Sequence, residues 1–230
     1  MALAAGLVFA QAQPANREAL WKQVAAAEKK GLPKTAAAKL QLIYDSALRD
    51  GRHAEAIKAL AKRITHEGAV QGNKPEEKIT RLRVELDKTP AEAKPLLQTI
   101  LGHWYWQYFR TNRYRFVQRT ATAEPLGDDF TTWDLPRLYR EIDLHFTNAL
   151  AVGRLKTIPA ADFAELLTKP TLPDYYRPTL YDFIAHEALG FYTAGEFAAA
   201  KPEDAFEVRV SDPLLGPLDK FLAWQPETTD

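Results

Sequence analysis

The chain has 230 residues, 46% of them hydrophobic and 26% charged, a composition typical of a folded globular protein rather than a disordered one. It contains no cysteine, which excludes disulfides, thiol catalysis, thiolate zinc sites and iron–sulfur ligation. Residues 1–120 hold 21 Lys+Arg and 11 Asp+Glu, a net charge of +10, and residues 121–230 hold 9 and 19, a net charge of −10. Such a division is typical of a basic arm for nucleic acid, of an acidic tail, or of two halves that pack together.

The first residues resemble a secretory signal peptide. Residues 1–13 read MALAAGLVFAQAQ, an uncharged apolar run followed by the small-x-small pattern Ala10-Gln11-Ala12 of a signal-peptidase site. No Lys or Arg precedes the run, and a start codon placed too late would explain the missing basic region. We therefore expect residues 1–12 to be a signal peptide and the chain to be exported to the periplasm or cell envelope, or outside the cell. The alternative is a short disordered tail.

Amphipathic spacing predicts a first group of helices that end at glycines. They are expected over Asn16–Lys30, Lys34–Asp50 and His53–His66, with stops at Gly31, Gly51 and Gly68. The second and third helices, joined by an Asp-Gly-Arg turn, should form an antiparallel hairpin that resembles a tetratricopeptide-like unit. The sequence has one good copy of this unit, so a regular solenoid is not predicted.

The next prediction is a central helix. Thr89-Pro90-Ala91-Glu92 has the pattern of a capping box with proline at the first helical position. The aromatic run Trp104–Phe109 (WYWQYF) leaves this helix apolar nearly all round, so it should have neighbours on several sides. We expect the rings of Trp104, Trp106 and Trp133 to be mostly buried.

The second half should follow a connection at Thr120–Asp129. Its expected helices are one capped by Thr132 and running to Leu150, a short one at Ala160–Leu167, and a last strong one at Pro178–Tyr192. The predicted fold is therefore all-α, with irregular helical hairpins, tetratricopeptide-like packing and no sizeable sheet. Residues 14–200 should form one helical domain, with the two charged halves facing each other across the connection. Residues 201–230 should be an extension that stops before a further element.

Metal-like spacings are weak in this sequence. The histidines are scattered at His53, His66, His103, His145 and His186. Asp143 with His145, and Asp182 with His186 on one helix face, come closest to a metal-binding pattern. Each pair offers two ligands where zinc needs three or four, so a hydrogen-bonded polar pair is the simpler interpretation. We assign no metal, cofactor-binding or catalytic residue.

Catalytic motifs are equally absent from the sequence. It has no glycine-rich phosphate loop, no Gly-x-Ser-x-Gly elbow and no Rossmann fingerprint. Adjacent carboxylates occur at Glu76-Glu77, Asp128-Asp129 and Glu203-Asp204, and nothing in the pattern forces any of them into an apolar pocket. We therefore predict a protein that is not an enzyme and that takes no cofactor.

The stretch Arg110–Arg119 (RTNRYRFVQR) interleaves arginines with Tyr114 and Phe116, as single-strand binding proteins do. It matches no known nucleic-acid fold, and export would make nucleic acid an improbable partner. We expect the aromatics to be core, the arginines to pair with the acidic half, and no nucleic-acid binding. No run of about 18 apolar residues predicts a membrane span either.

Taken together, several segments resemble the helical N-terminal region of large bacterial alpha-2-macroglobulin-like proteins. They are Trp21–Leu48, Tyr105–Arg119, Trp133–Leu150 and Arg177–Tyr192. The most specific parts are the Trp-Asp-Leu start of one helix and the Pro-Thr-Leu-Tyr-Asp-Phe-x-Ala-His start of another. Their order also matches, and the resemblance spans about Trp21 to Trp224.

The resemblance implies endopeptidase inhibition in the cell envelope, by a full-length protein in which β-sandwich macroglobulin domains follow. The family's bait region and Cys-x-x-Gln thioester motif lie downstream, so none of their residues carries over to this chain. The implied partners are those downstream domains and, for the full-length form, proteases. The resemblance also implies a buried structural role for His186. The alternatives are a self-standing helical-repeat module that binds a protein or peptide, and an enzyme whose site is not visible.

Overall fold

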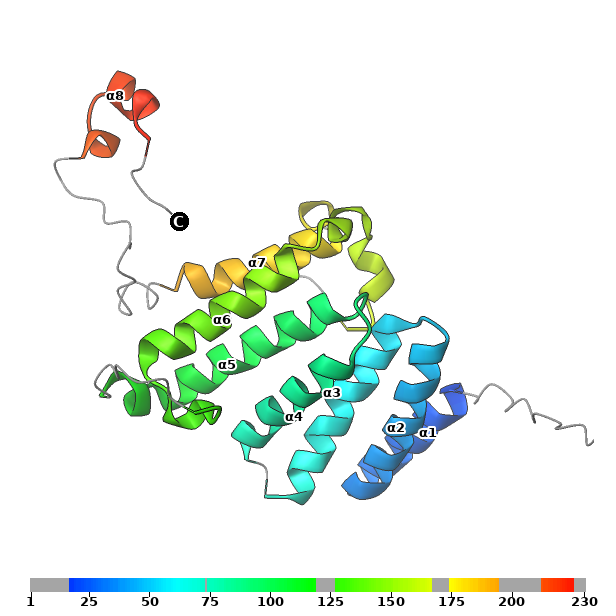
Figure 1. The fold of residues 1–230 in the computed structure, drawn as a ribbon. Helices are drawn as coiled ribbons and strands as arrows, with labels where there is room; N and C mark the ends of the chain where they lie inside the picture. Colours follow the sequence, from blue (N-terminus) through cyan, green and yellow to red (C-terminus); the bar gives the residue numbers. More distant parts are fainter. Residues whose placement is uncertain (1–16, 73, 119–126, 167–173, 195–211, 226–230) are drawn as a thin grey trace, which may run out of the picture.

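The computed structural model describes residues 17–72, 74–118, 127–166, 174–194 and 212–225. Within these ranges the chain forms helices and no strand, apart from one isolated bridge between Pro159 and Thr179 (Figure 1). The α-helices are α1 (Arg17–Lys29), α2 (Pro33–Arg49), α3 (His53–Val70), α4 (Pro75–Lys88), α5 (Lys94–Val117), α6 (Leu135–Leu150), α7 (Leu180–Tyr192) and α8 (Leu218–Ala223). The 3₁₀ turns are η1 (Phe130–Thr132), η2 (Gly153–Thr157), η3 (Ala160–Phe163), η4 (Asp174–Tyr176) and η6 (Pro213–Leu215). The predicted all-α fold is confirmed.

Three sequence predictions fall wholly or largely outside the described residues. They are the signal peptide at residues 1–12, most of the connection at Thr120–Asp129, and the start of the extension at residue 201.

Helices α1, α2 and α3 pack as successive antiparallel neighbours, and glycines form the turns between them. Gly31 and Gly51 have φ near +65°, a conformation that other residues rarely adopt. After each glycine the next backbone N–H bonds back to the helix, Leu32 to the Ala27 carbonyl at 2.9 Å and Arg52 to the Ala47 carbonyl at 2.8 Å. These are Schellman turns, which satisfy the last carbonyls of a helix and reverse the chain. The predicted stops at Gly31 and Gly51 are confirmed.

Two other predicted boundaries are wrong. Gly68 does not end its helix, because α3 continues to Val70. Thr89 does not cap α5 either: its hydroxyl donates to the Glu85 carbonyl at 2.7 Å, so it closes α4. A turn over residues 90–93 follows, and α5 begins at Lys94 with Pro95 in its first turn. Threonine at a helix end can bond backward as well as forward, and here the backward bond forms.

Helix α5 is the centre of the fold and packs against α4, α6 and α7 (Figure 1). Its aromatic rings meet others edge to face: Tyr105 with Phe130 at 5.1 Å, and Phe109 with Tyr139 at 5.1 Å between centroids. Such pairs stabilise a core beyond the area they bury. Trp133 is buried, whereas Trp104 and Trp106 are partly exposed at the core's edge. None of the three tryptophans is more than half exposed, as predicted.

Helix α6 starts two residues later than expected. Thr132 lies in η1, and Asp134 is the N-cap, accepting a hydrogen bond from the Arg137 backbone N–H at 2.9 Å. Residues Ala160–Phe163 form a 3₁₀ turn where the sequence predicted a short helix to Leu167. Asp is among the best N-cap residues, and here it takes that position from the threonine before it.

Charged side chains of the two halves meet at places within the described residues. Lys58 of α3 lies 3.5 Å from Glu165, and His103 of α5 lies 3.5 Å from Glu187 of α7. The basic half also neutralises many of its own charges. Examples are Arg17 with Glu55, Lys62 with Glu28, Arg63 with Glu85 and Arg81 with Glu67.

Gly102 of α5 packs closely against α6, and this contact leads to a stability prediction. A Cβ added at Gly102 would lie 3.1 Å from the ring of Phe146, whereas at Gly153 it would meet nothing within 4 Å. Gly102→Leu should lower the free energy of unfolding by about 1–3 kcal/mol, despite the roughly 1 kcal/mol gain in helix propensity. Urea denaturation measures the change. Gly153→Leu is the matched control, and an equal effect of the two would contradict close packing at Gly102.

Candidate functional site

Asp182 and His186, the pair nearest to a metal-like spacing, do not form a site. The Asp182 carboxylate accepts from the Thr179 backbone N–H at 3.0 Å and from its hydroxyl at 2.6 Å. The Thr179 hydroxyl in turn accepts from the Asp182 backbone N–H, which completes a capping box at the start of α7. His186 is exposed one turn later, so the buried role that the family resemblance implied for it is wrong.

Asp143 and His145, the second metal-like pair, contact different partners and do not form a site either. Asp143 accepts a hydrogen bond from the Tyr192 hydroxyl, whereas His145 is buried beside Gln98 of α5. Among the described residues no group of three or more His, Cys, Asp or Glu side chains is placed to hold a metal ion.

The paired carboxylates serve local structure where they are described. Glu76 and Glu77 lie in the first turn of α4, where the helix dipole favours negative charge. Asp129 caps η1 by accepting from the Thr131 backbone N–H at 3.0 Å. Glu203 and Asp204 lie outside the described residues.

The basic aromatic stretch ends α5 with a mixed surface. Phe116 is buried, as predicted for a core residue, but Tyr114 is 68% exposed. Arg115 donates to the Tyr108 hydroxyl at 3.2 Å, and Arg110 lies over the Trp106 ring. The expectation that this stretch binds no nucleic acid stays a prediction. No helix in the described ranges is both long and apolar enough to cross a membrane.

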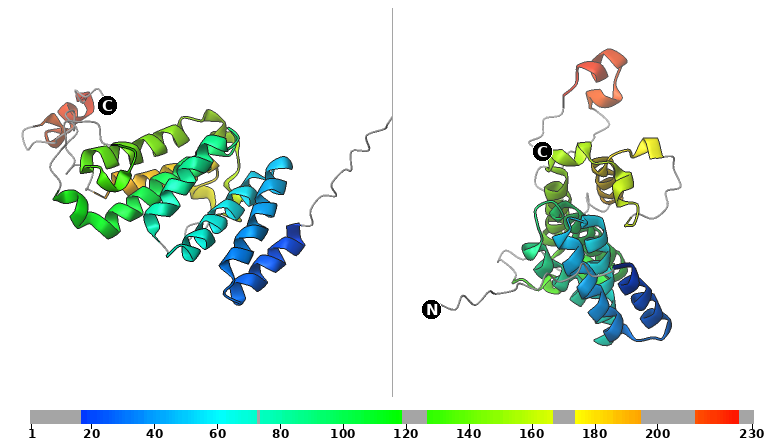
Figure 2. Two further views of the ribbon diagram at one scale, coloured as in Figure 1. Left: turned by 60° about the horizontal axis from the view of Figure 1, so that its bottom comes forward. Right: turned by 90° about the vertical axis from the view of Figure 1, so that its right-hand side faces the viewer.

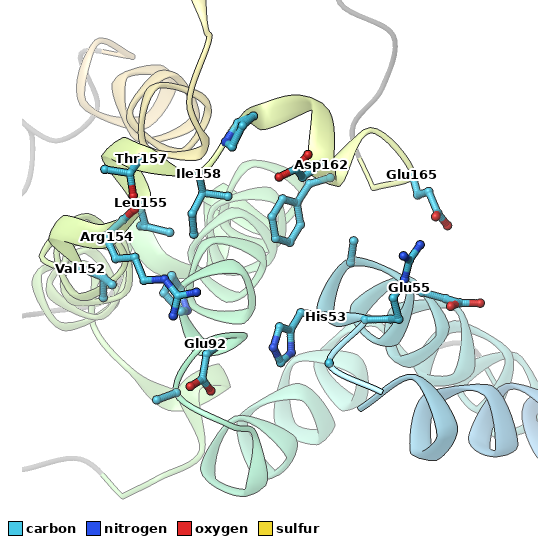
Figure 3. Close-up of a pocket in the computed structure, with 17 residues that line it drawn as sticks. His53, Glu55, Glu92, Val152, Arg154, Leu155, Thr157, Ile158, Asp162 and Glu165 are labelled. Atoms are coloured by element: carbon cyan, nitrogen blue, oxygen red, sulfur yellow. Dashed lines mark hydrogen bonds between the residues drawn. The ribbon is translucent and has the colours of Figure 1, made fainter. Parts of the chain in front are cut away.

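Polar groups from several segments converge on a cleft of about 680 Å³, which we call the seam cleft (Figure 3). One wall is the start of α3, the opposite wall is the η2–η3 segment, and the turn before α5 contributes Glu92. Its charged and imidazole side chains are Arg52, His53, Glu55, Glu92, Arg154, Asp162 and Glu165. Leu155, Ile158 and Phe163 supply apolar surface.

Some charges around the seam cleft are already paired. Glu55 accepts from Arg17 and from the Trp21 indole, both at 2.9 Å. By contrast, the His53 Nδ1 atom is buried with no hydrogen-bond partner. Figure 3 shows His53, Glu92, Arg154 and Asp162 around the open space. Leaving a buried polar atom without a hydrogen bond costs about 1–3 kcal/mol, so the His53 Nδ1 atom destabilises the start of α3.

The lining of the seam cleft combines polar and apolar side chains without a nucleophile paired to a base. Its lining contains no Ser, Cys, Lys or Tyr, and the Thr157 hydroxyl donates to the Arg154 carbonyl at 2.8 Å. Nucleophilic catalysis needs a nucleophile hydrogen-bonded to a base, and no such pair lines the cleft. Polar groups of both signs beside apolar side chains instead suit a peptide segment.

Sequence reasoning missed the seam cleft. It treated His53 as one of several scattered histidines and gave Arg154 and Asp162 no role. These residues are about 100 positions apart in the chain and meet only because the chain returns through η2 and η3 to the start of α3. No short sequence pattern shows that the chain comes back to the start of α3.

A buried polar cluster lies between α5 and α6. His145 stacks on Tyr105 with centroids 5.6 Å apart, and its Nδ1 is bonded to the Gln98 side chain. Burial, with the nearby charge of Arg83, lowers the pKa of His145 to about 4. Burial also raises the pKa of Tyr105. The Glu141 carboxylate lies 3.5 Å from Nε2 at the more exposed edge of the cluster.

This cluster predicts acid sensitivity. An unfolded histidine titrates near pH 6.5, so between pH 6.5 and about 4 the unfolded state binds a proton that the folded state excludes. The free energy of unfolding should therefore fall as the pH drops through this window, by about 3 kcal/mol from His145 alone. Urea denaturation at pH 7 and pH 4.5 measures the fall. His145→Asn should show a smaller fall, and an equal one would contradict this origin.

The capping box yields a further prediction. Asp182→Ala should lower the free energy of unfolding by about 1 kcal/mol, because α7 loses its cap, whereas His186→Ala should change it by less than about 0.5 kcal/mol. Thermal denaturation with zinc and with EDTA supplies the test of metal binding. A zinc-dependent rise in melting temperature that both substitutions abolish would contradict the structural role.

Comparison with known proteins finds no matching family model, no matching curated protein and no matching solved structure.

Proposed function

We propose that the chain is the helical, non-catalytic N-terminal region of a bacterial alpha-2-macroglobulin-like protein. In this proposal the chain is exported to the cell envelope, and the full-length protein inhibits endopeptidases. The proposal rests on the sequence resemblance, and one structural observation supports the non-catalytic part of it. The most specific motifs of the resemblance are used to start helices and to fill the core.

The Trp-Asp-Leu motif illustrates this use. Trp133 is buried between Tyr105 and Phe130, and its indole donates to the Gly127 carbonyl at 2.7 Å. Arg137 lies over the same ring at 4.5 Å, and Asp134 caps α6. Every side chain of the motif that bears a polar group therefore has a structural partner, which is what a scaffold requires.

The Pro-Thr-Leu-Tyr-Asp-Phe motif is used in the same way. Thr179 and Asp182 form the capping box of α7, and Leu180 is buried. Lys156 lies 4.8 Å from the centre of the Tyr181 ring. Capping and packing account for Thr179, Leu180 and Asp182, which supports a positioning role for the start of α7, whereas His186 at the end of the motif is exposed.

The alternative function is a self-standing module that binds a peptide, and the seam cleft favours it. The two functions make different predictions for the isolated chain. Arg154→Glu reverses a charge in the seam cleft and should reduce the affinity for a captured peptide at least tenfold if the chain is such a module. Arg140→Glu, at an exposed position on α6 outside the lining, is the matched control.

As the N-terminal region of an inhibitor, the chain should not inhibit endopeptidases by itself. The purified chain, mixed in molar excess with serine, cysteine, aspartic and metallo-endopeptidases, should leave cleavage of a protein substrate unchanged within error. The coding sequence beyond residue 230 should encode macroglobulin sandwiches. Stoichiometric inhibition by the chain alone, or an authentic stop codon directly after residue 230, would overturn the proposal.

A further inference from the structure

The turn between α1 and α2 exposes an apolar side chain among lysines. Residues 29–34 read KKGLPK, and we call this segment the lysine turn. Leu32 at its tip is 47% exposed. Lys29, Lys30 and Lys34 are exposed on either side of it. A single exposed leucine is ordinary on a protein surface, so the three cations around it are the distinguishing feature.

The positive charge of the lysine turn is not neutralised by its neighbours. None of its three lysines forms an ion pair with another described residue. Glu28, which directly precedes the turn, is bonded instead to Lys62 and His66 of α3, at 2.8 Å in both cases. The lysine turn therefore presents three uncompensated positive charges to the solvent.

Helix stability does not explain all of this charge. Lys29 lies in the last turn of α1, where the helix dipole favours a cation. Lys34 lies in the first turn of α2, where the dipole disfavours a cation and where no acidic residue offsets it. The first turns of α1, α3 and α4 instead carry acidic residues, among them Glu18, Glu55 and Glu76. A charge that opposes its own helix, beside an exposed leucine, favours a contact outside the chain.

The backbone holds the lysine turn in one shape. Gly31 has a φ of 66°, and the Leu32 N–H bonds to the Ala27 carbonyl at 2.9 Å. Pro33 follows as the first residue of α2. Figures 1 and 2 show the turn at the free end of the α1–α2 pair, with no other helix laid across it. A partner therefore meets a preformed tip, and little backbone freedom is lost on contact.

We propose that the lysine turn contacts the surface of an anionic phospholipid bilayer. Its three ammonium groups lie at the headgroup phosphates, and Leu32 enters the boundary of the acyl chains. Lysines close to an anionic membrane are attracted to it, and their apolar stems lie along the interface while the charged ends reach the phosphates. The contact is peripheral and reversible, because stable anchoring takes more than one weak membrane signal.

The composition of the lysine turn favours lipid over nucleic acid. Single-strand binding proteins stack bases on aromatic rings, and base readers use the arginine fork. Residues 29–34 contain neither an aromatic residue nor an arginine. An apolar tip gains free energy in acyl chains and gains nothing from a phosphate backbone. The inference goes beyond the proposed function and does not depend on it, since an inhibitor region and a self-standing module would both retain this turn.

Vesicle co-sedimentation tests the proposal on the complete chain. The wild type should bind vesicles of phosphatidylglycerol mixed with phosphatidylcholine at least tenfold more tightly than vesicles of phosphatidylcholine alone. The triple variant Lys29→Gln, Lys30→Gln and Lys34→Gln should lose at least tenfold of this affinity, because each lysine near an anionic surface contributes roughly fivefold. Equal affinity of the wild type for the two kinds of vesicle overturns the proposal.

A second triple variant controls for net charge. It removes three positive charges at exposed positions outside the lysine turn, through Arg49→Gln, Lys88→Gln and Arg140→Gln. This variant should keep the vesicle affinity of the wild type within about threefold, because charges further than a Debye length from the membrane are screened. Equal losses in the two triple variants overturn the assignment to the lysine turn.

A fluorescent label locates the tip in the bilayer, and the absence of native cysteine makes the labelling specific. The nitrobenzoxadiazole label on Leu32→Cys should brighten and shift to the blue on anionic vesicles. The same label on Leu42→Cys is the control. Leu42 is 50% exposed and lies about 15 Å further along α2, so its label should not respond. An equal response at the two positions, or none at position 32, overturns insertion of the tip.

A single-stranded oligodeoxynucleotide separates a lipid contact from a general site for polyanions. Leu32→Gln should weaken vesicle binding by roughly fivefold, because the leucine side chain no longer leaves water, whereas Leu42→Gln should not weaken it. An oligonucleotide bound through the lysine turn as tightly as the vesicles, together with no loss of vesicle binding in Leu32→Gln, overturns the lipid proposal.

Discussion

The fold depends on the need to cover the aromatic rings of α5. Tyr105, Tyr108 and Phe109 are buried, whereas Gln107 and Arg110 of the same helix are exposed, so neighbouring elements must cover most of its circumference. Helices α4, α6 and α7 supply that cover, and the η1 turn adds Phe130 and Trp133. The chain order fits this requirement, because α4 covers part of the helix that follows it, and α6 and α7 of the second half cover more of that helix.

The same requirement explains where the polar groups go. A crowded aromatic core leaves room for few polar side chains, and burial in it lowers the pKa of His145 to about 4. The conspicuous Thr and Asp residues of the second half lie at helix starts, where they bond to backbone N–H groups. The Thr and Asp residues that stand out in the sequence of the second half are therefore used to start helices.

Local signals in the sequence predicted much of this architecture. The helix ends at Gly31 and Gly51 could be predicted because a positive φ strongly favours glycine. Helix α5 could be predicted because its aromatic run is apolar nearly all round the helix. The caps at Thr89 and Thr132 were wrong, since threonine bonds forward or backward according to neighbours that a pattern does not contain. The exposed position of His186 and the seam cleft depend on how distant segments pack, so no local spacing encodes them.

The seam cleft also shows how the two halves of the molecule are joined. Lys58 and Glu165, which bridge its two sides at 3.5 Å, are both partly exposed, so their attraction contributes at most about 1 kcal/mol. The two halves are held together mainly by the buried contacts of α5 with α6 and α7. These contacts lie away from the start of α3. A ligand in the cleft would touch both walls without displacing a packed interface. Its contacts with both walls would therefore add to the cohesion of the two halves.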